Sequence, residues 1–398
     1  MVLLSSTHYT KPMRVIIVGA GVVGTMAAWR LAQAGHDVIV CEQFDLDHDR
    51  GSSYGDSRIV RRVYTDALYT ALMADAYPLW NELQSHFPHE ELFSLPGGIF
   101  FGPRTHPQIE AAEDALIRSR VEYERLDAAS CARRFPAVKL RQDEVALYEP
   151  SMGYARASRC VRAAATLAKR HGAQIREHTP VAEIEPGAGG NGLRVLTGTG
   201  ECLSGERLST DKVLICAGPW TQRCLAKLGI EVPLNVVRKT YIHLEPARHH
   251  ENFEASCFPV WIDADSLAYG FPRLGDVPGV KLAMHGGGET TLPGTVERVV
   301  LERDRAVLHE YAVKRFPDLS RRVVYEKVCL YTNTPDEDFI IDAVPGLAGA
   351  FFIGGLSGHG FKFGPLLGEI ALALVTGAAM PYDLSRFSCT RFQCDGAQ

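Results

Sequence analysis

Three glycines near the N-terminus and one acidic residue have the spacing of a dinucleotide-binding turn. Gly19, Gly21 and Gly24 form a G-x-G-x-x-G pattern, and Glu42 follows Gly19 by 23 residues. The first glycine permits a tight turn, the second lets backbone amides approach a pyrophosphate, and the third lets a helix pack closely on a strand. The acidic side chain can accept hydrogen bonds from ribose hydroxyls and would repel the additional phosphate of NADP. The pattern therefore predicts a site for FAD or NAD.

The segments around these glycines predict the elements that such a turn needs. Residues 14–18 (RVIIV) predict a buried strand, residues 25–35 (TMAAWRLAQAG) predict a helix, and residues 37–43 (DVIVCEQ) predict a second strand. In a unit of this kind the N-terminus of the helix faces the phosphates of the ligand.

The rest of the chain predicts two interleaved regions. After residue 90 the alternation of helices with parallel strands breaks down, and mixed strand and turn patterns replace it. Residues 157–171 predict an amphipathic helix, residues 212–220 predict a buried strand that returns to the first sheet, and residues 236–284 predict further strands. Residues 294–316 predict a helix. Residues 350–377 predict a strand, a glycine loop and a helix, which is a second place where a helix N-terminus could meet a cofactor.

Composition and charge exclude several classes of protein. The chain has 398 residues with 46% hydrophobic and 22% charged side chains, which suits a globular protein of two domains. Its 42 Lys and Arg against 47 Asp and Glu give a net charge of −5, so it has no basic excess for binding nucleic acid. The longest apolar runs, at 15–23 and 370–380, are too short to span a bilayer, and we expect no membrane partner.

The termini and the cysteines bear on location and on metal binding. The first twelve residues lack the basic start and apolar stretch of a secretory signal, and the last four residues, DGAQ, lack a peroxisomal S-K-L tripeptide. We therefore expect a cytoplasmic protein. The ten cysteines show no C-x-x-C pair and no neighbouring histidine ladder. We expect most of them to be small buried side chains, with neither a metal site nor a disulfide framework.

Three further blocks, together with the glycine turn, resemble the monomeric sarcosine oxidase family of flavin amine oxidases. That family also includes N-methyltryptophan oxidase, pipecolate oxidase and fructosyl amino acid oxidases. The blocks are GSSYGDSRIVRRVY at 51–64, CLYTNTPDEDFIID at 329–342 and GLSGHGFKFG at 355–364. They are more specific than the glycine pattern, and the likeness spans essentially the whole chain. The resemblance implies FAD as the cofactor.

One cysteine acquires a role from this resemblance. In the family, the cysteine that opens a C-x-Y-T-x-T-x-D-x-x-F-x-I-D stretch bonds to the 8α-methyl group of FAD, and Cys329 matches that position. A thiolate is a suitable nucleophile for an electron-poor flavin methyl group. The resemblance therefore implies covalent attachment of FAD through Cys329. The other matching positions are Tyr331, Thr332, Thr334, Asp336, Phe339 and Asp342.

The resemblance also assigns roles to four cationic residues. Arg61 and Lys362 match the arginine and the lysine that bind the substrate carboxylate, for which a guanidinium fork and an ammonium group are suitable partners. Arg58 matches a residue that lies against the flavin ring and favours the reduced, anionic flavin. Lys281 matches a lysine that promotes the reaction of reduced flavin with dioxygen.

The remaining candidate residues come from the same resemblance. His285 and Tyr269 are expected in the catalytic pocket, and Gly358 and His359 in the loop that binds the substrate. For each histidine a purely structural role stays open as an alternative. The expected cofactor contacts are Gly19, Gly21, Gly24, Glu42, Ser57, Val181, Gly218, Trp220, Cys329, Gly360 and Phe361.

Together these patterns predict an α/β (α+β) fold. A Rossmann-like FAD-binding domain would be interleaved with a substrate domain built on a mixed, largely antiparallel β-sheet. The expected FAD-binding domain comprises residues 1–90, 150–235 and 320–398. The expected substrate domain comprises residues 91–149 and 236–319.

The resemblance implies an FAD-dependent oxidase of a secondary amino acid. The C–N bond of an N-methyl or related N-substituted amino acid would be oxidised to an imine that hydrolyses, with dioxygen reduced to hydrogen peroxide. We expect a monomer whose partners are a small amino acid and dioxygen. A substrate larger than sarcosine is favoured, because residues 240–246, 257–263 and 283–291 differ from the small-substrate pattern.

Several alternatives remain open at this point. The enzyme could be a pipecolate-type cyclic or a fructosyl amino acid oxidase, or a flavin amine dehydrogenase that uses another electron acceptor. Less favoured are an NAD-linked dehydrogenase, which would have no use for Cys329 and its block, and a flavoprotein without catalysis.

Overall fold

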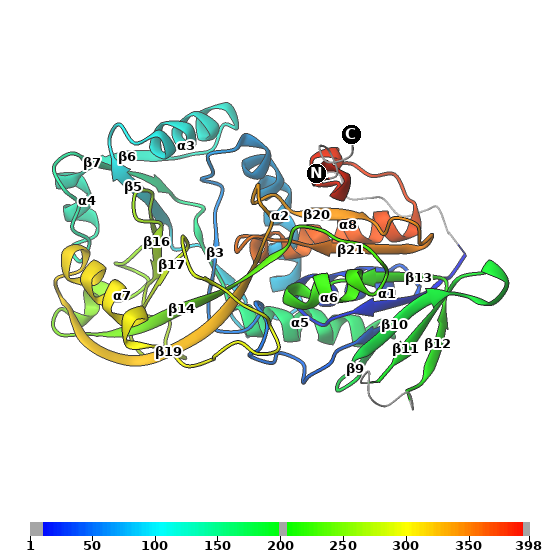
Figure 1. Ribbon diagram of the computed structural model, residues 1–398. Coiled ribbons are helices and arrows are strands. Elements are labelled where there is room, and N and C mark those ends of the chain that lie inside the picture. The colour runs from blue at the N-terminus through cyan, green and yellow to red at the C-terminus, as the bar shows by residue number, and fades with distance from the viewer. Residues whose placement is uncertain (1–10, 199–204, 393–398) are drawn as a thin grey trace, which may run out of the picture.

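The structure is a computed structural model that describes residues 11–198 and 205–392. Two regions lie side by side in Figure 1, one built on a six-stranded sheet and the other on a nine-stranded sheet. The expectations about the two chain ends concern residues that lie largely or wholly outside the described ranges, so they stay predictions.

The six-stranded sheet carries the expected dinucleotide-binding unit. Its order is β20-β21-β13-β1-β2-β9, and its neighbouring strands are parallel except at the β20–β21 pair. The predicted strands at 14–18 and after 37 are confirmed, and the strand from residue 212 returns beside the first strand as predicted. The strands are β1 (Arg14–Val18), β2 (Asp37–Cys41), β9 (Gln174–Arg176), β13 (Lys212–Ile215), β20 (Ile340–Ala343) and β21 (Ala350–Gly354).

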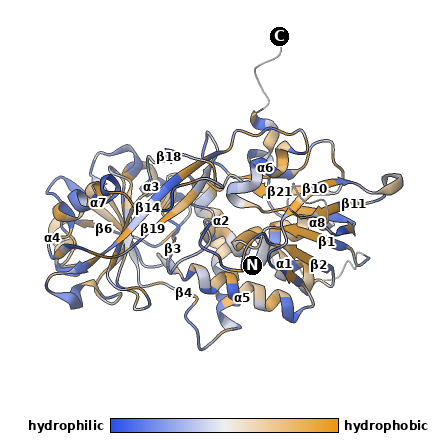
Figure 2. Ribbon diagram, turned by 60° about the horizontal axis from the view of Figure 1, so that its bottom comes forward, coloured by the Kyte–Doolittle hydropathy of each residue, from blue (hydrophilic) through white to orange (hydrophobic). Residues whose placement is uncertain are grey.

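Helices cover one face of this sheet and a small antiparallel sheet covers the other. The covering elements are α1 (Val22–Gln33), α5 (Ala157–Arg170), α8 (Gly364–Thr376), β10 (Val181–Pro186), β11 (Leu193–Thr197) and β12 (Arg207–Thr210). Val15 and Ile17 of β1 pack in the cluster that holds the helices, whereas Ile16 and Val18 pack with the small sheet. Because both faces are covered, the strand is apolar in consecutive positions. Figure 2 shows these central strands as hydrophobic.

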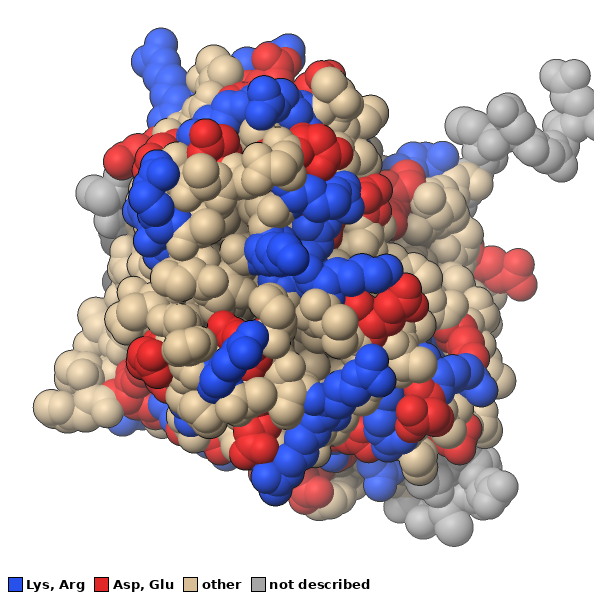
Figure 3. Space-filling view, turned by 90° about the vertical axis from the view of Figure 1, so that its left-hand side faces the viewer, with Lys and Arg blue, Asp and Glu red and all other residues tan. Residues whose placement is uncertain are grey.

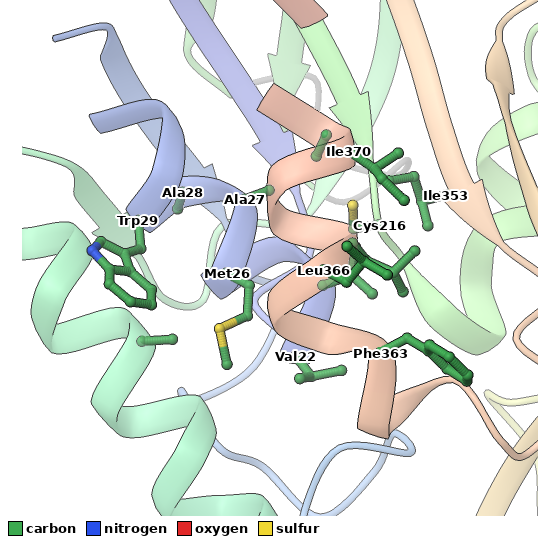
Figure 4. Packing of buried hydrophobic residues seen from close by; sticks show 14 of the residues in the cluster. Val22, Met26, Ala27, Ala28, Trp29, Cys216, Ile353, Phe363, Leu366 and Ile370 are labelled. Atoms are coloured by element: carbon green, nitrogen blue, oxygen red, sulfur yellow. The ribbon is translucent and has the colours of Figure 1, made fainter. Parts of the chain in front are cut away.

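The helical layer is closely packed where α1 meets α8. In Figure 4, Met26 of α1 lies opposite Leu366 of α8 in the apolar space beside the sheet. Gly368 makes the close approach possible, because a Cβ atom there would lie only 3.0 Å from the carbonyl carbon of Met26. This packing holds the N-termini of both helices beside the carboxyl ends of the strands, where ligands of open α/β sheets bind.

The nine-stranded sheet forms the second region and is largely antiparallel, as expected. Its order is β18-β14-β17-β16-β15-β5-β7-β6, with β19 paired to β14, and β15 runs parallel to β5. The strands are β5 (Gly98–Pro103), β6 (Glu124–Asp127), β7 (Glu144–Glu149), β14 (Asn235–Pro246), β15 (Val260–Asp263), β16 (Ala268–Phe271), β17 (Val280–Met284), β18 (Glu289–Thr290) and β19 (Leu319–Asn333).

Strand β19 corrects one expected boundary. The sequence predicts that residues 320–398 belong to the FAD-binding domain, but β19 pairs with β14 from Asn235–Asn333 to Pro246–Leu319. Residues 319–333 therefore belong to the nine-stranded sheet, beside which they run in Figure 1. An apolar pattern predicts that a segment is a strand and leaves open which sheet it joins, because the pairing partner is distant in sequence. The other domain limits stay predictions.

The helix expected at 294–316 is shorter than its pattern suggested. Helix α7 spans Glu302–Arg315, and the carbonyl groups of Glu297 and Val299 bind the guanidinium group of Arg238 instead of helical amides. The Asp304 carboxylate accepts the amide hydrogen of Leu301 at 2.9 Å and so begins the helix there.

A small sheet, further helices and short 3-10 turns complete the described part of the chain. A three-stranded sheet, ordered β3-β8-β4, comprises β3 (Arg58–Val60), β8 (Gly153–Ala155) and β4 (Phe93–Ser94). The other helices are α2 (Ala67–Ser85), α3 (Pro107–Arg118), α4 (Ala128–Arg134) and α6 (Thr221–Ala226). Short 3-10 turns occupy Ala188–Gly190, Gly218–Trp220, His250–Phe253, Phe361–Phe363, Ser385–Phe387 and Cys389–Phe392.

The described surface carries mixed charges (Figure 3), and most of the described cysteines are buried. In Figure 3 the face of the second region carries lysine and arginine interspersed with aspartate and glutamate, without a broad patch of one sign. No helix within the described residues is long and apolar enough to cross a membrane. Of the eight described cysteines six are buried and none forms a disulfide, while Cys202 and Cys394 lie outside the described residues. Among those same described residues, no group of three or more potential ligands gathers for a metal ion.

Candidate active site

The glycine turn between β1 and α1 has the geometry that only glycine tolerates. Gly19 has φ of +101°, and a Cβ atom there would lie 2.6 Å from the carbonyl oxygen of Cys216. A Cβ atom on Gly24 would lie 1.9 Å from the carbonyl oxygen of Gly19, so this residue lets the first turn of the helix pack against the turn. Gly21 borders a cavity instead. These are the three steric requirements of a dinucleotide-binding turn.

Glu42 is held at the end of β2 beside this turn. Its Oε2 accepts the amide hydrogen of Ala20 at 2.8 Å, and its Oε1 accepts that of Phe44 at 3.0 Å. The side chain is buried and borders the same cavity as Gly21. Two carboxylate oxygens offer about four acceptor positions, so capacity remains for ribose hydroxyls.

This first cavity, of about 290 Å³, has a lining that suits the nucleotide half of FAD. A second cavity, of about 400 Å³, adjoins it, since both are bordered by Ser52, Arg58, Leu330, Tyr331, Gly358 and Phe361. The glycine turn lies at one end of this joined space and Cys329 borders the other part. The residues present therefore fit an extended dinucleotide whose redox ring would lie near Cys329. The expected contacts that border the first cavity are Gly19, Gly21, Glu42, Val181, Gly218, Trp220, Gly360 and Phe361.

Arg58 is fixed by the loop that precedes β3. Its guanidinium group donates to the carbonyl oxygens of Ser57 at 2.7 Å, Ser52 at 2.8 Å and Tyr54 at 2.7 Å. It borders both cavities. The three carbonyl partners are neutral groups, so they do not cancel the positive charge of Arg58, which borders the joined space.

Cys329 comes from β19 and lies in a cationic surrounding. The thiol is buried, and burial raises its pKa, while Arg58, Lys281 and Lys239 act in the opposite direction. The net result is a raised pKa, so the thiol is protonated at neutral pH, and the nearby positive charges reduce the free energy needed to form the thiolate.

Lys281 of β17 is buried, and no carboxylate of the described residues contacts its ammonium group. Its Nζ donates to both the carbonyl oxygen and the Oγ of Ser57 at 3.2 Å, and lies 4.3 Å from the ring centroid of Tyr241. Burial, followed by repulsion from Arg58, lowers the pKa of Lys281 to about 7. Ser57 itself, expected at the cofactor, borders neither cavity and lies behind Lys281.

Arg61 and Lys362 form a second pair of cations in the same cavity. Lys362 donates to the hydroxyl oxygen of Tyr64 at 2.9 Å and to the carbonyl oxygen of His359 at 2.7 Å. The guanidinium carbon of Arg61 lies 4.4 Å from the ring centroid of Tyr64. Burial, followed by repulsion from Arg61, holds the pKa of Lys362 well below its ordinary value. Two cations that repel each other in a buried site favour the binding of an anion.

The carboxylates that border this second cavity are mostly engaged elsewhere. Arg386 pairs with Asp66 at 2.6 Å and with Asp338 at 2.7 Å, and Arg391 pairs with Asp336 at 2.8 Å. The cations near Cys329 are therefore not neutralised by these carboxylates.

The other expected pocket residues also gather here. The hydroxyl oxygens of Tyr269 and Tyr331 lie 3.2 Å apart, within hydrogen-bond distance. Burial lowers the pKa of His285 to about 3, with Arg61 as the next cause, so its ring is neutral at physiological pH. His359 contacts the carbonyl oxygen of Glu337 at 3.0 Å through Nε2, and Gly358 borders both cavities.

Two residues that lie beside this site, Lys239 and Glu149, belong to none of the sequence motifs. Lys239 of β14 is buried and donates to carbonyl groups of the loop after β17. Glu149 accepts the amide hydrogens of Arg62 and Val63 at 2.9 Å and so fixes the segment after β3 that carries Arg61. A charged residue inside a buried stretch such as VVRKTYI is the one local feature that could have indicated Lys239.

Comparison with known proteins agrees with this geometry. A family model described as FAD dependent oxidoreductase matches residues 14–374. Human peroxisomal sarcosine oxidase is 32% identical over 387 residues, which cover 95% of each chain. Monomeric sarcosine oxidase of Bacillus sp. (strain NS-129) is 30% identical and covers 97% of each chain. N-methyl-L-tryptophan oxidase of Escherichia coli is 30% identical over 95% of this chain and 99% of its own.

Solved structures show the same fold. NikD, an unusual amino acid oxidase essential for nikkomycin biosynthesis, superposes in its open form with a TM-score of 0.82 at 26% identity, covering 95% of this chain and 98% of that one. L-proline dehydrogenase from P. horikoshii reaches the same TM-score at 21% identity, which supports the fold alone. The chain belongs to the family of FAD-dependent oxidoreductases and, within it, to the group of monomeric sarcosine oxidase and N-methyl-L-tryptophan oxidase.

Proposed function

We propose that this protein is an FAD-dependent oxidase of a secondary amino acid. Its substrate would be an N-methyl or related N-substituted amino acid, and its products an imine, which hydrolyses, and hydrogen peroxide. The observation that carries the proposal is the pair of half-buried Arg61 and buried Lys362 in the cavity that Cys329 also borders. Such a pair suits a carboxylate, and the acidic residues Asp66, Asp336 and Asp338 of the same cavity pair with Arg386 and Arg391 instead.

The chain's own residues would bind and orient the substrate. The carboxylate would lie between Arg61 and Lys362, and the amine would point toward the part of the cavity that Arg58 and Lys281 border. A cationic pocket disfavours a protonated amine, so it favours the neutral amine, which alone has a lone pair to release. FAD would supply the redox chemistry, which removes two electrons and two protons from the CH–NH unit. Water then adds to the C=N bond, and an N-methyl group would leave as formaldehyde.

Lys281 would serve the second half-reaction. A positive charge held in a dry site stabilises the negative charge that develops as dioxygen is reduced. Dioxygen takes up the two electrons and two protons to give hydrogen peroxide. The contacts with Ser57 and Tyr241 hold the ammonium group without neutralising it, which supports this role. An oxidase is for this reason preferred to a dehydrogenase that passes electrons to another carrier.

Covalent attachment of FAD through Cys329 belongs to the same proposal. The position of the thiol in the joined cavity and its cationic neighbours Arg58 and Lys281 support it. We further propose a monomer, in keeping with the names of the bacterial relatives. Its cytoplasmic location stays a prediction.

Two measurements on the purified protein test the proposal. After denaturation with acid, the yellow chromophore should precipitate with the polypeptide. A peroxide-linked assay with sarcosine, N-methyl-L-tryptophan, pipecolate and fructosyl amino acids should give peroxide with one class. Colour that stays in the supernatant would contradict the covalent link, and substrate-dependent reduction without peroxide would indicate a dehydrogenase.

A further inference from the structure

The wall of the second cavity includes a loop that one buried ammonium group holds in place. The loop, residues 285–288, has the sequence His-Gly-Gly-Gly and connects β17 to β18. Lys239 of β14 donates from Nζ to the carbonyl oxygen of His285 at 2.6 Å, to that of Gly286 at 2.8 Å, and to that of Gly287. An ammonium group has three hydrogens to donate, so these bonds use all of them.

The loop also packs closely against β14. Gly288 has φ of +104°, and a Cβ atom there would lie 2.5 Å from Cγ1 of Val237 and 2.8 Å from the carbonyl oxygen of Arg238. Only glycine fits this position. The loop therefore approaches β14 closely where the Lys239 side chain meets it.

The same three residues face the second cavity. The cavity is bordered by His285, Gly286 and Gly287, and also by Arg61 and Lys362. The carbonyl oxygens of the three loop residues point to Lys239. Without the ammonium group, three neighbouring carbonyl dipoles would converge on one buried place without a donor, which is unfavourable. The loop would then turn some of them toward water and move the wall.

Lys239 links this wall to the strand that bears Cys329. The two residues are direct partners across β14 and β19, and directly opposed side chains lie on the same face of a sheet. The Nζ atom of Lys239 lies 5.2 Å from the ring centroid of Tyr331, which borders both cavities. One buried cation thus contacts both the substrate wall and the cofactor strand.

We propose that Lys239 is a positioning residue that holds the 285–287 wall of the substrate cavity and thereby sets the affinity for the amino acid substrate. This inference rests on the proposed function. It assigns Lys239 no part in the oxidation of the C–N bond or in the reaction with dioxygen, because its donors are all engaged by the loop.

The test compares Lys239→Met with the wild-type holoenzyme, using sarcosine and N-methyl-L-tryptophan as probes. For whichever probe the wild-type enzyme oxidises, we expect KM to rise by roughly tenfold or more, since charged hydrogen bonds within the wall are lost. The limiting rate of flavin reduction and the rate of reoxidation by dioxygen should change by less than about threefold. Lys314→Met is the matched control, because Lys314 is an exposed lysine of α7 that pairs with Glu310. It should leave KM unchanged.

A second variant approaches the wall from the other side. Gly288→Ala keeps Lys239 but pushes the loop away from β14, and it should raise KM in the same way. Equal KM in wild type and Lys239→Met, with only a lower melting temperature, would overturn the proposal. So would a loss of covalent flavin or of the reoxidation rate at unchanged KM. If the wild-type enzyme oxidises no secondary amino acid, the proposed function fails before Lys239 is tested.

Discussion

Replacing Lys281 by methionine tests the dioxygen half-reaction most directly. Methionine keeps most of the side-chain volume and removes the positive charge. Since a preorganised charge or donor at a developing anion accelerates a reaction by on the order of 10²-fold, the reoxidation of reduced flavin should slow by about that factor. Reduction by substrate should change far less, because Arg61 and Lys362 bind the carboxylate.

The pH dependence gives the second part of this prediction. With a pKa of about 7, Lys281 is about 90% protonated at pH 6 and about 10% protonated at pH 8. Any negative charge on the bound cofactor would raise this pKa, so the wild-type reoxidation rate should fall with a midpoint at or above pH 7. Rapid mixing of reduced enzyme with dioxygen across pH 6 to 10 measures it. The Lys281→Met variant should show no such fall.

The same buried charge should cost stability. The pKa of Lys281 in the folded protein lies below its value in the unfolded chain, so the unfolded state binds more protons between about pH 7 and pH 10.4. The free energy of unfolding of the cofactor-free protein should therefore rise with pH through that window. At pH 7 the methionine variant should be more stable by up to about 4 kcal/mol, and the difference should vanish near pH 10.5. Unchanged reoxidation in Lys281→Met would refute the assignment of that residue.

Four further substitutions and one calorimetric measurement test the site. Cys329→Ala should leave flavin that acid denaturation releases, as seen by absorbance of the supernatant. Arg61→Ala and Lys362→Ala should each weaken substrate binding by roughly 1.5–3 kcal/mol, or about 10- to 150-fold in the dissociation constant. Because a bound carboxylate would raise the depressed pKa of Lys362, binding should take up a proton and weaken as pH rises, which titration calorimetry in two buffers detects. Gly24→Ala should abolish flavin binding or folding, since its Cβ would overlap the carbonyl oxygen of Gly19.

Local patterns predicted the elements whose structure depends on neighbouring residues. The run at 14–18, the glycine turn and the helix from residue 157 agree with β1, the turn at Gly19 and α5. The helix expected from residue 294 begins only at Glu302, because the carbonyl groups before it bind Arg238 from a distant strand. The periodicity of hydrophobic residues cannot predict that contact, because Arg238 is distant in sequence.

The sequence by itself determined the dinucleotide turn, since its steric demands are met within a few residues of Gly19 and Glu42. It also determined the family, because several blocks match at once. Only the tertiary structure brings Arg61 near Lys362, and it places β19, with Cys329, in the second sheet rather than the first. These contacts join segments that lie up to about 300 residues apart, where a residue's partner depends on how whole sheets pack. The role of Lys239 belongs to this second kind, because its three acceptors exist only once the loop lies on β14.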